Sequence, residues 1–296
     1  MLIERISDQS VEIITPAKIN LFLEVLNRRP DGYHNINSLF QAVSLYDRLT
    51  FSVSEKPGVT IELDGEIQVT TGQDNLVWQV YRLLDGQFRL PRGLEVILEK
   101  NIPVAAGLGG GSSDGAATIA ACNLLFNLGL STGDMVRLSL LIGSDLAFFF
   151  SRGQALVTGR GETVKETDFS TDYWIVLVCP GMEISTASSY ASLKRGLTIS
   201  KTPFNLAPGP RVEELVESLQ LSGNDFEEIH LESYPELGRI KDELLQAGAA
   251  LSRMTGSGPS VFGVFSEAPE LIGGEAFGRK GWRMHTVLPV LFPTQA

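Results

Sequence analysis

Apolar and polar residues alternate over several short stretches of the chain, and this pattern is typical of β-strands. In residues 94–100, for example, Leu94, Val96 and Leu98 would share one face of a strand. The continuous apolar run of residues 174–179 predicts a strand that is buried on both faces. Strand-like patterns also occur over residues 11–14, 19–26, 39–45, 49–53, 59–63, 154–157, 260–265 and 282–296.

Helical spacing of apolar residues predicts helices between these strands. In residues 75–84, Leu76, Val80 and Leu84 would lie on one face of a helix. Residues 114–128 are rich in Ala and Leu at the same spacing. Further helices are expected over residues 212–219 and 237–246, and another is expected to begin near Ser131 or Thr132, either of which could cap it.

The order of these elements bears on the fold class. Helices and strands are interspersed without a strict alternation of strand, helix and strand, so we expect an α+β fold rather than a doubly wound sheet. The polar stretch of residues 159–168 separates two groups of elements. It predicts two domains, one of residues 1–165 and one of residues 166–296.

A glycine-rich loop joins the strand at 94–100 to the helix expected from residue 114. Because glycine lacks a Cβ atom, an anion can approach such a backbone closely, and a helix N-terminus adds free N–H groups and a positive dipole end. The loop therefore predicts a phosphate site, although a flexible turn is the alternative. It lacks the lysine of a Walker A loop and the spacing of a dinucleotide fingerprint. Its residues are Pro103, Val104, Ala105, Ala106, Gly107, Leu108, Gly109, Gly110, Gly111, Ser112 and Ser113.

Two polar motifs precede this loop. Side chains alternate along a strand, so Lys18 and Asn20 would share one face, either as a polar platform or as the solvated face of an edge strand. Further on, the turn Pro-Asp-Gly is followed at once by Tyr33 and His34. These two rings could stack on a ligand or bond to it, or Tyr33 could simply pack against the turn.

Two other motifs follow the loop. Asp145 comes after Gly-Ser and ahead of three phenylalanines, which favours a helix cap but also allows a catalytic carboxylate. Residues 255–260 form a second glycine turn just before a strand. It could be an ordinary turn or one wall of a ligand cleft, because small residues let two backbones come close.

The composition argues against several classes of protein. A net charge of −11 disfavours a nucleic-acid partner, because binding a polyanion normally needs a basic face. No stretch approaches the roughly 20 apolar residues that span a bilayer, so no membrane association is expected. The N-terminus lacks the pattern of a signal peptide, and Cys122 and Cys179 lie in apolar segments. These features predict a cytoplasmic protein without a structural zinc site.

Together the motifs resemble those of the GHMP kinase superfamily. Its members carry a Pro-x-x-Lys/Arg-x-Asn-type segment, a Pro-x-x-x-Gly-Leu-Gly-Ser-Ser-type phosphate loop and a C-terminal Gly-x-Gly turn. Similar segments occur here in that order, at residues 16–20, 103–113 and 254–260. The run Asp-Gly-Tyr-His at residues 31–34 resembles one branch in particular, whose members act on a cytidine diphosphate derivative of methylerythritol.

The resemblance implies a two-domain α+β fold with ATP and substrate in a cleft between the domains. It implies transfer of the γ-phosphoryl group of ATP to the 2-hydroxyl of 4-(cytidine 5'-diphospho)-2-C-methyl-D-erythritol, a step of non-mevalonate isoprenoid precursor synthesis. Lys18 and Asp145 match the superfamily's catalytic pair, and the loop matches its ATP-phosphate site. Mg²⁺ would neutralise phosphate charge, with Ser113 or Glu162 near it. The positions that match residues around the substrate are Asn20, Tyr33, His34 and Tyr190.

Some features depart from the superfamily's pattern or leave alternatives open. Asp145 is followed by Leu-Ala where a proline is usual, and the segment before Tyr190 lacks its usual proline. The charge of Asp114 would repel a phosphate, so its side chain should point away or toward a cation. The alternatives are a mevalonate- or homoserine-type kinase and a non-catalytic nucleotide-binding sensor. We expect a monomer or a weak homodimer.

Overall fold

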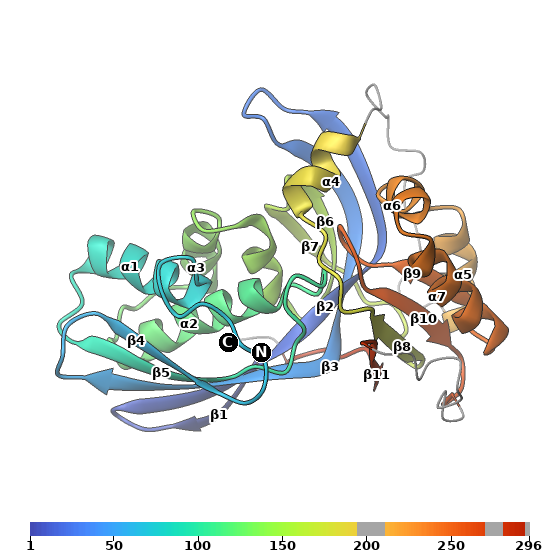
Figure 1. The fold of residues 1–296 in the computed structure, drawn as a ribbon. Helices are drawn as coiled ribbons and strands as arrows, with labels where there is room; N and C mark the ends of the chain where they lie inside the picture. The colour runs from blue at the N-terminus through green and yellow to red at the C-terminus, as the bar shows by residue number, and fades with distance from the viewer. Residues whose placement is uncertain (194–210, 270–280, 294–296) are drawn as a thin grey trace.

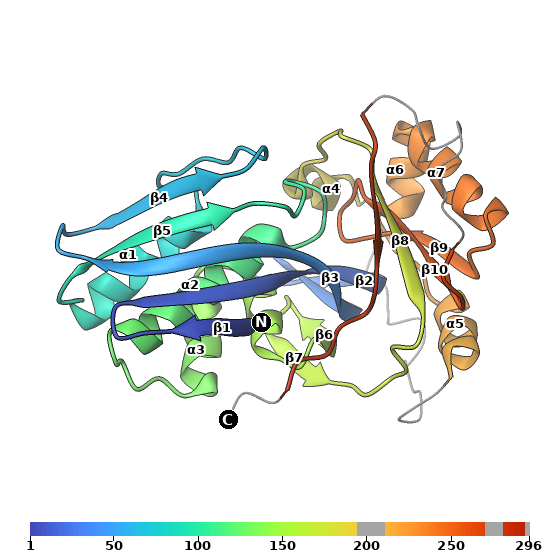
Figure 2. The same cartoon turned by 90° about the horizontal axis from the view of Figure 1, so that it is seen from below.

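The computed structural model describes residues 1–193, 211–269 and 281–293, which form two β-sheets with helices packed on each (Figure 1). One sheet has seven strands and the other has four. The view in Figure 2 shows the two sheets side by side, with the long strands β2 and β3 reaching from the first toward the second. The α+β class expected from the sequence is therefore confirmed.

The first sheet is built on two long strands. Its main strand order is β1-β2-β3-β5-β4, and β6 pairs with β3 and β7. The segments at 11–14 and 19–26 belong to one strand, β2. Its alternation of apolar and polar residues is interrupted because the register shifts after Pro16. The stretches at 39–45 and 49–53 likewise belong to one strand, and the same shift interrupts the alternation between them. The strands are β1 (Leu2–Ile6), β2 (Ser10–Arg28), β3 (His34–Ser54), β4 (Val59–Asp64), β5 (Gly93–Glu99), β6 (Gln154–Gly159) and β7 (Thr163–Glu166).

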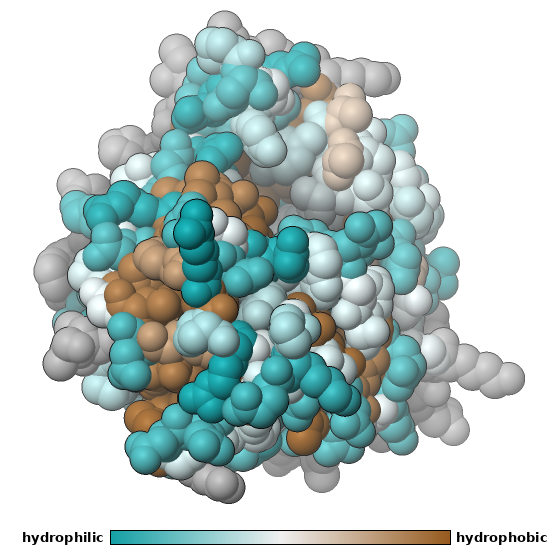
Figure 3. Space-filling model, turned by 90° about the vertical axis from the view of Figure 1, so that its left-hand side faces the viewer, coloured by the Kyte–Doolittle hydropathy of each residue, from teal (hydrophilic) through white to brown (hydrophobic). Residues whose placement is uncertain are grey.

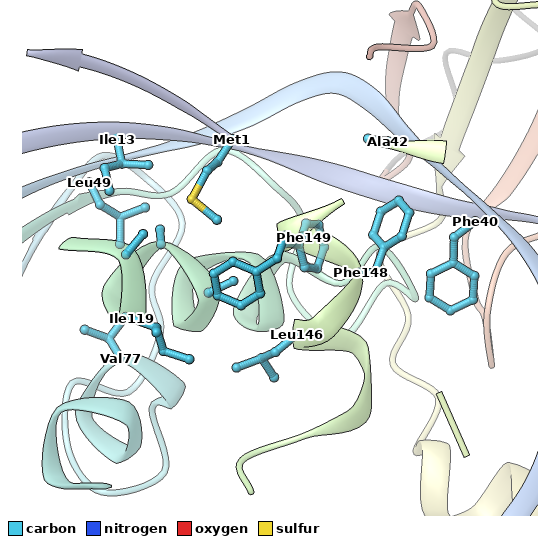
Figure 4. Close-up of a cluster of buried hydrophobic side chains, with 14 of the residues drawn as sticks. Met1, Ile13, Phe40, Ala42, Leu49, Val77, Ile119, Leu146, Phe148 and Phe149 are labelled. Carbon is cyan, nitrogen blue, oxygen red and sulfur yellow. The ribbon is translucent and has the colours of Figure 1, made fainter. Parts of the chain in front are cut away.

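One face of this sheet is covered by helices, and the hydrophobic core lies between the two layers. Figure 4 shows Ile13 and Leu49 of the sheet opposite Ile119 and Val77 of two helices. As the sequence suggested, Ser131 caps a helix, and its partner in the capping box is Asp134. The helices are α1 (Leu76–Phe88), α2 (Gly110–Leu125), α3 (Thr132–Ser139) and the short 3₁₀ helix η1 (Ser144–Phe150).

The second sheet has the order β11-β8-β10-β9, and β8, one of its two inner strands, is the apolar run predicted to be buried. Of the strand expected at 282–296, only residues 283–287 form a strand, and residues 294–296 lie outside the described residues. Its strands are β8 (Trp174–Cys179), β9 (Leu251–Met254), β10 (Val261–Phe265) and β11 (Arg283–Val287). The helices of this part are α4 (Thr186–Ser192), α5 (Val212–Gln220), α6 (Glu227–Ser233) and α7 (Pro235–Gln246).

The chain changes sheets between β7 and β8 and later returns to the first sheet. The amide of Val290 donates to the carbonyl of Ala42 at 2.9 Å, and the amide of Phe292 donates to the carbonyl of Arg152 at 2.8 Å. The last described residues therefore pack against the first sheet although they follow the second in sequence. A domain boundary at residue 165 remains a prediction.

The surface carries apolar residues in separate patches. Figure 3 looks at the end of the molecule where α1 lies and shows hydrophobic areas interrupted by polar ones. Within the part of the chain that the structure describes, no helix combines the length and the apolar character needed to cross a bilayer.

Candidate functional site

A cavity of about 450 Å³ lies between the glycine loop, β2 and the second half of the chain. The loop contributes ten consecutive residues to its lining, 103–112, and the first turn of α1 contributes Asn75 and Leu76. The glycine turn at 255–260, for which the sequence left an ordinary turn as an alternative, contributes Gly256 and Ser257. The other polar or aromatic lining residues include Lys18, Asn20, Phe40, Asp145, Tyr190 and Phe226.

The loop ends directly in α2, which begins at Gly110, four residues before the start predicted from the apolar pattern. Gly109 precedes the helix with a φ of 70°, in the left-handed region that favours glycine. A Cβ atom here would lie 3.0 Å from Cγ of Lys18. Gly110, Gly111 and Ser112 of the first helical turn line the cavity, and backbone N–H groups at this position have no partner within a helix, which suits an anion.

Lys18 lies at the centre of the polar contacts. Its Nζ is 3.5 Å from Oδ2 of Asp145, and it donates to Oδ1 of Asn20 at 2.7 Å and to the carbonyl of Gly107 at 3.3 Å. The Lys18 side chain is only 4% exposed, so the alternative of a solvated edge-strand face is wrong. Burial lowers the pKa of Lys18, and the charge of Asp145 opposes this shift.

Asp145 does not cap its helix, contrary to the interpretation that its local sequence favoured. Gly143 holds the cap position of η1, and Asp145 lies in the first turn with its side chain 38% exposed. Behind it, Phe148 and Phe149 are buried between the sheet and the helices (Figure 4). Leu146, one of the residues that departs from the usual proline pattern, is fully buried as well. This apolar anchor fixes the backbone that carries the carboxylate.

Asn20 connects the lysine to the second glycine turn. Its backbone N–H donates to Oγ1 of Thr255 at 2.9 Å, and its side-chain Nδ2 donates to Oγ of Ser38 at 2.9 Å. Its Oδ1 is left to accept from Lys18. All groups of the Asn20 side chain therefore have partners, which holds the amide in one orientation.

The aromatic residues expected around a base lie near one end of the cavity. His34 stacks on Tyr190 with ring centroids 5.3 Å apart, and Tyr190 packs edge-on against Phe226 at 5.0 Å. Burial, followed by the charge of Arg28, lowers the pKa of His34, while burial and the charge of Asp145 raise the pKa of Tyr190 to about 12. Both rings are therefore neutral near pH 7.

Four predicted residues lie outside the cavity lining, and one of them, His34, is next to it through its stacking on Tyr190. Tyr33 is 57% exposed, and the guanidinium of Arg160 lies 5.3 Å from its ring centroid. Ser113 is buried and donates to the carbonyl of Pro16 at 2.7 Å. Glu162 pairs with Arg29 at 3.3 Å. In the described ranges, no cluster of three or more His, Cys, Asp or Glu residues could hold a metal ion.

A second charged cluster, which the sequence did not suggest, lies beside the same loop. Lys100 donates to Oδ2 of Asp114 at 2.8 Å and also to Asp47, so Asp114 points toward a cation, as expected. Asp47 accepts the amides of Asn101 and Ile102 as well. Burial, with the nearby charge of Asp47, raises the pKa of Asp114 to about 8 even though Lys100 opposes the shift. Asp47 lies in strand β3, and the residues around it in sequence do not indicate that its side chain is buried.

Comparison with known protein families identifies both halves of the chain. Residues 75–153 match the model of the GHMP kinases N terminal domain, and residues 207–277 match that of the GHMP kinases C terminal domain. A 4-diphosphocytidyl-2-C-methyl-D-erythritol kinase of Syntrophotalea carbinolica is 40% identical over 283 residues, which covers 94% of this chain and 98% of that protein. The enzyme of the same name from Geobacter metallireducens is 38% identical and covers 90% and 92%.

Solved structures show the same relationship. A crystal structure of 4-(cytidine 5'-diphospho)-2C-methyl-D-erythritol kinase superposes with a TM-score of 0.73 at 30% identity, covering 94% of this chain and 99% of the other. A homoserine kinase from Cytophaga hutchinsonii reaches a TM-score of 0.72, but at 19% identity over 99% of this chain and 98% of its own. This second likeness shows a shared fold only.

Proposed function

The chain belongs to the GHMP kinases, and within them to the 4-diphosphocytidyl-2-C-methyl-D-erythritol kinase family, and from this premise we propose how its residues divide the work. It is an ATP-dependent kinase that phosphorylates the 2-hydroxyl of 4-(cytidine 5'-diphospho)-2-C-methyl-D-erythritol. One observation carries the assignment of roles. The ion pair of Lys18 and Asp145 lines the same cavity as the glycine loop, with Nζ and Oδ2 3.5 Å apart.

The glycine loop and the start of α2 bind the phosphates of ATP. Their free N–H groups and the positive end of the helix dipole favour the polyanion, even though the whole chain has a net charge of −11. The amide of Lys18 donates to the carbonyl of Leu108 at 2.9 Å, so the strand that carries the lysine is tied to the loop. This bond sets the distance between the bound phosphate and the reacting groups.

Asp145 accepts the proton of the attacking hydroxyl, or orients that hydroxyl for attack. The hydroxyl oxygen forms a bond to the γ-phosphorus, the bond to the β–γ bridging oxygen breaks, and ADP leaves. Lys18 holds the carboxylate of Asp145 in place through their ion pair and offsets negative charge on the transferring group. Phosphoryl transfer depends on alignment and charge stabilisation, and these two residues would supply both.

Mg²⁺ bound to the nucleotide would neutralise part of the phosphate charge. The residues present fit an ion that keeps most of its ligands from phosphate and water, because Mg²⁺ is often held by few protein groups. Ser112 lines the cavity at the N-terminal turn of α2, so its hydroxyl is the one we assign to the ion. The earlier expectation for Ser113 is less favourable, since its hydroxyl is already bonded to Pro16.

The acceptor binds in the part of the cavity lined by Asn20 and Tyr190. Asn20 contacts the polyol, while the neutral rings of His34 and Tyr190 bind the cytosine by hydrogen bonds and stacking. The two rings are already in contact at 5.3 Å, so a base that enters between them must separate them. Tyr33 lies next to His34 on the same turn, and we assign it to the outer edge of the base site.

Product analysis tests this function. The protein is incubated with Mg-ATP and either 4-(cytidine 5'-diphospho)-2-C-methyl-D-erythritol, mevalonate or homoserine, and ³¹P NMR follows ADP and the new phosphomonoester. We expect a phosphomonoester on the 2-hydroxyl of the first compound only. Turnover of mevalonate or homoserine instead would favour the other kinases on this fold. Binding of ATP without transfer to any acceptor would favour a sensor.

A further inference from the structure

The segment of residues 223–227, which links α5 to α6, is bonded to two separate strands of the molecule. The amide of Leu23 in β2 donates to the carbonyl of Gly223 at 2.8 Å, and the amide of Asp225 donates back to Leu23 at 2.9 Å. Oδ2 of Asp225 also accepts the amide of Val25 at 2.7 Å. One side of the segment is thus fixed to the strand that carries Lys18 and Asn20.

The other side of the segment holds the second glycine turn. Nδ2 of Asn224 donates to the carbonyls of Met254 and Gly256, both at 2.8 Å, and Oδ1 of Asn224 accepts the amide of Phe226 at 3.0 Å. Only 5% of Asn224 is exposed. A primary amide is the group that can give two donors to two carbonyls while it accepts from a third backbone group.

The turn held by Asn224 touches both the lysine's partner and the phosphate loop. Thr255 lies between Met254 and Gly256, the two acceptors of Asn224, and its Oγ1 accepts the backbone N–H of Asn20 at 2.9 Å. A Cβ atom on Gly256 would lie 3.0 Å from the carbonyl of Gly107, which in turn accepts from Lys18 at 3.3 Å. A displacement of this turn would therefore reach Lys18 by two routes, through Asn20 and through Gly107.

We infer that Asn224 is a positioning residue for phosphoryl transfer, acting through the turn at Thr255 on Asn20 and Lys18. It lies outside the cavity lining, so it acts without touching ATP or acceptor. The inference rests on the proposed roles of Lys18 and Asn20. Small misplacements of reacting groups reduce turnover strongly, and a shift of about 1 Å can cost about 100-fold.

The variant Asn224→Asp tests this with little change in shape. It keeps the acceptor for Phe226 but puts an oxygen without donors against the carbonyls of Met254 and Gly256. The matched control is Asn123→Asp, because Asn123 makes the same kinds of bonds to the amide and carbonyl of Leu130, far from the cavity. Both variants lose a side-chain donor to a backbone carbonyl, and because Asn123 is only partly buried, Asn123→Asp should lose the same or less thermal stability.

Steady-state kinetics at a temperature where both variants are folded separate the two roles. We expect kcat of Asn224→Asp to fall about 10- to 100-fold with KM for ATP and acceptor changed less than about 3-fold. Asn123→Asp should keep the wild-type kcat. Equal kcat in Asn224→Asp and wild type would overturn the inference, while absence of wild-type turnover would contradict the proposed function instead.

A double-mutant cycle with Thr255→Val tests the route. If Asn224 acts through Thr255, the double variant should lose little more than Asn224→Asp alone, because both changes break the same connection. If the fold-losses in kcat of the two single variants multiply in the double variant, Asn224 does not act through Thr255. If Asn224→Asp does not fold, Thr255 still decides: Thr255→Val must lower kcat while Thr255→Ser, which keeps the hydroxyl, must restore it. Wild-type kcat in Thr255→Val would contradict the inference.

Discussion

Two clusters of lysine and aspartate lie beside the same glycine loop, and they differ in access to solvent. In the open pair, Lys18 and Asp145, the carboxylate side chain is 38% exposed within the cavity. In the closed triad, Lys100, Asp47 and Asp114, no side chain is more than 5% exposed. The same residue types are thus placed for different tasks: a partly open carboxylate can meet a substrate, whereas the triad's closed carboxylates mainly hold backbone and loop in place.

The comparison also shows that burial and a shifted pKa do not by themselves identify the reacting carboxylate. Asp114 has the most strongly shifted pKa among the carboxylates of the site region, and such shifts often mark functional groups. Here the shift arises from burial and from Asp47, in a cluster that anchors residues 100–102. Lys100 and Asp114 also belong to the cavity lining, but only 5% of the Asp114 side chain is exposed, against 38% for Asp145. The exposed fraction of the carboxylate, rather than the size of its pKa shift, therefore distinguishes the reacting group.

The largest effect should come from Lys18→Met, which removes the cation of the open pair. We expect kcat to fall by about 10³-fold or more, since charge on the transferring group is no longer offset. The remaining carboxylate of Asp145 is partly exposed and can be hydrated, so the variant should fold and bind ATP. Calorimetry and an ADP assay measure both properties. Turnover within a few-fold of wild type would remove Lys18 from the reaction.

A smaller effect, and one of another kind, is expected for Asp47→Asn in the closed triad. The variant weakens a charged hydrogen bond to Lys100 and should lower the free energy of unfolding by about 1.5–3 kcal/mol. Because Asp47 lies outside the cavity, the folded enzyme should retain most of its kcat. Denaturant unfolding and kinetics of the same sample check this. A loss of kcat as large as that of Lys18→Met, without lost stability, would erase the distinction between the clusters.

The smallest effect concerns the pH dependence of stability. The pKa of Asp114 is raised from 3.8 to about 8 in the folded chain, so between these values the folded state keeps a proton that the unfolded chain releases. Stability from this group therefore falls as pH rises across that range. Asp114→Asn removes the titrating carboxyl group, so it should flatten the dependence of melting temperature on pH between pH 5 and 8. An unchanged slope would show that Asp114 is ionised in the folded protein.

The sequence could predict the elements whose pattern is local. The run at 174–179 became the buried strand β8, and Ser131 caps α3, because both depend on neighbouring residues. The loop, Lys18 and Asp145 were also found in advance, through a motif resemblance as much as through their own chemistry. Their meeting in one cavity depends on contacts between distant parts of the chain, such as the bond from Lys18 to Gly107 across 89 positions, which no local pattern contains.

Other features could not be read from neighbouring residues. Asp47 lies in a strand whose alternation gives no hint that its side chain is buried with Lys100. Asn224 was missed for the same reason, because its partners Met254 and Gly256 lie 30 and 32 positions away. The wrong interpretation of Asp145 as a cap had a different cause: Gly143 takes the cap position, and the anchoring phenylalanines decide where the carboxylate points.

The central claim is that the open pair carries out phosphoryl transfer, and single-turnover kinetics of Asp145→Asn test it most directly. The variant keeps the size of the side chain and removes the charge that accepts or orients the proton. With enzyme in excess over the acceptor and ATP at saturation, the account predicts a rate of ADP formation lower by at least about 10²-fold. Thermal stability and ATP affinity should stay near wild type. A single-turnover rate close to that of wild type would contradict the account.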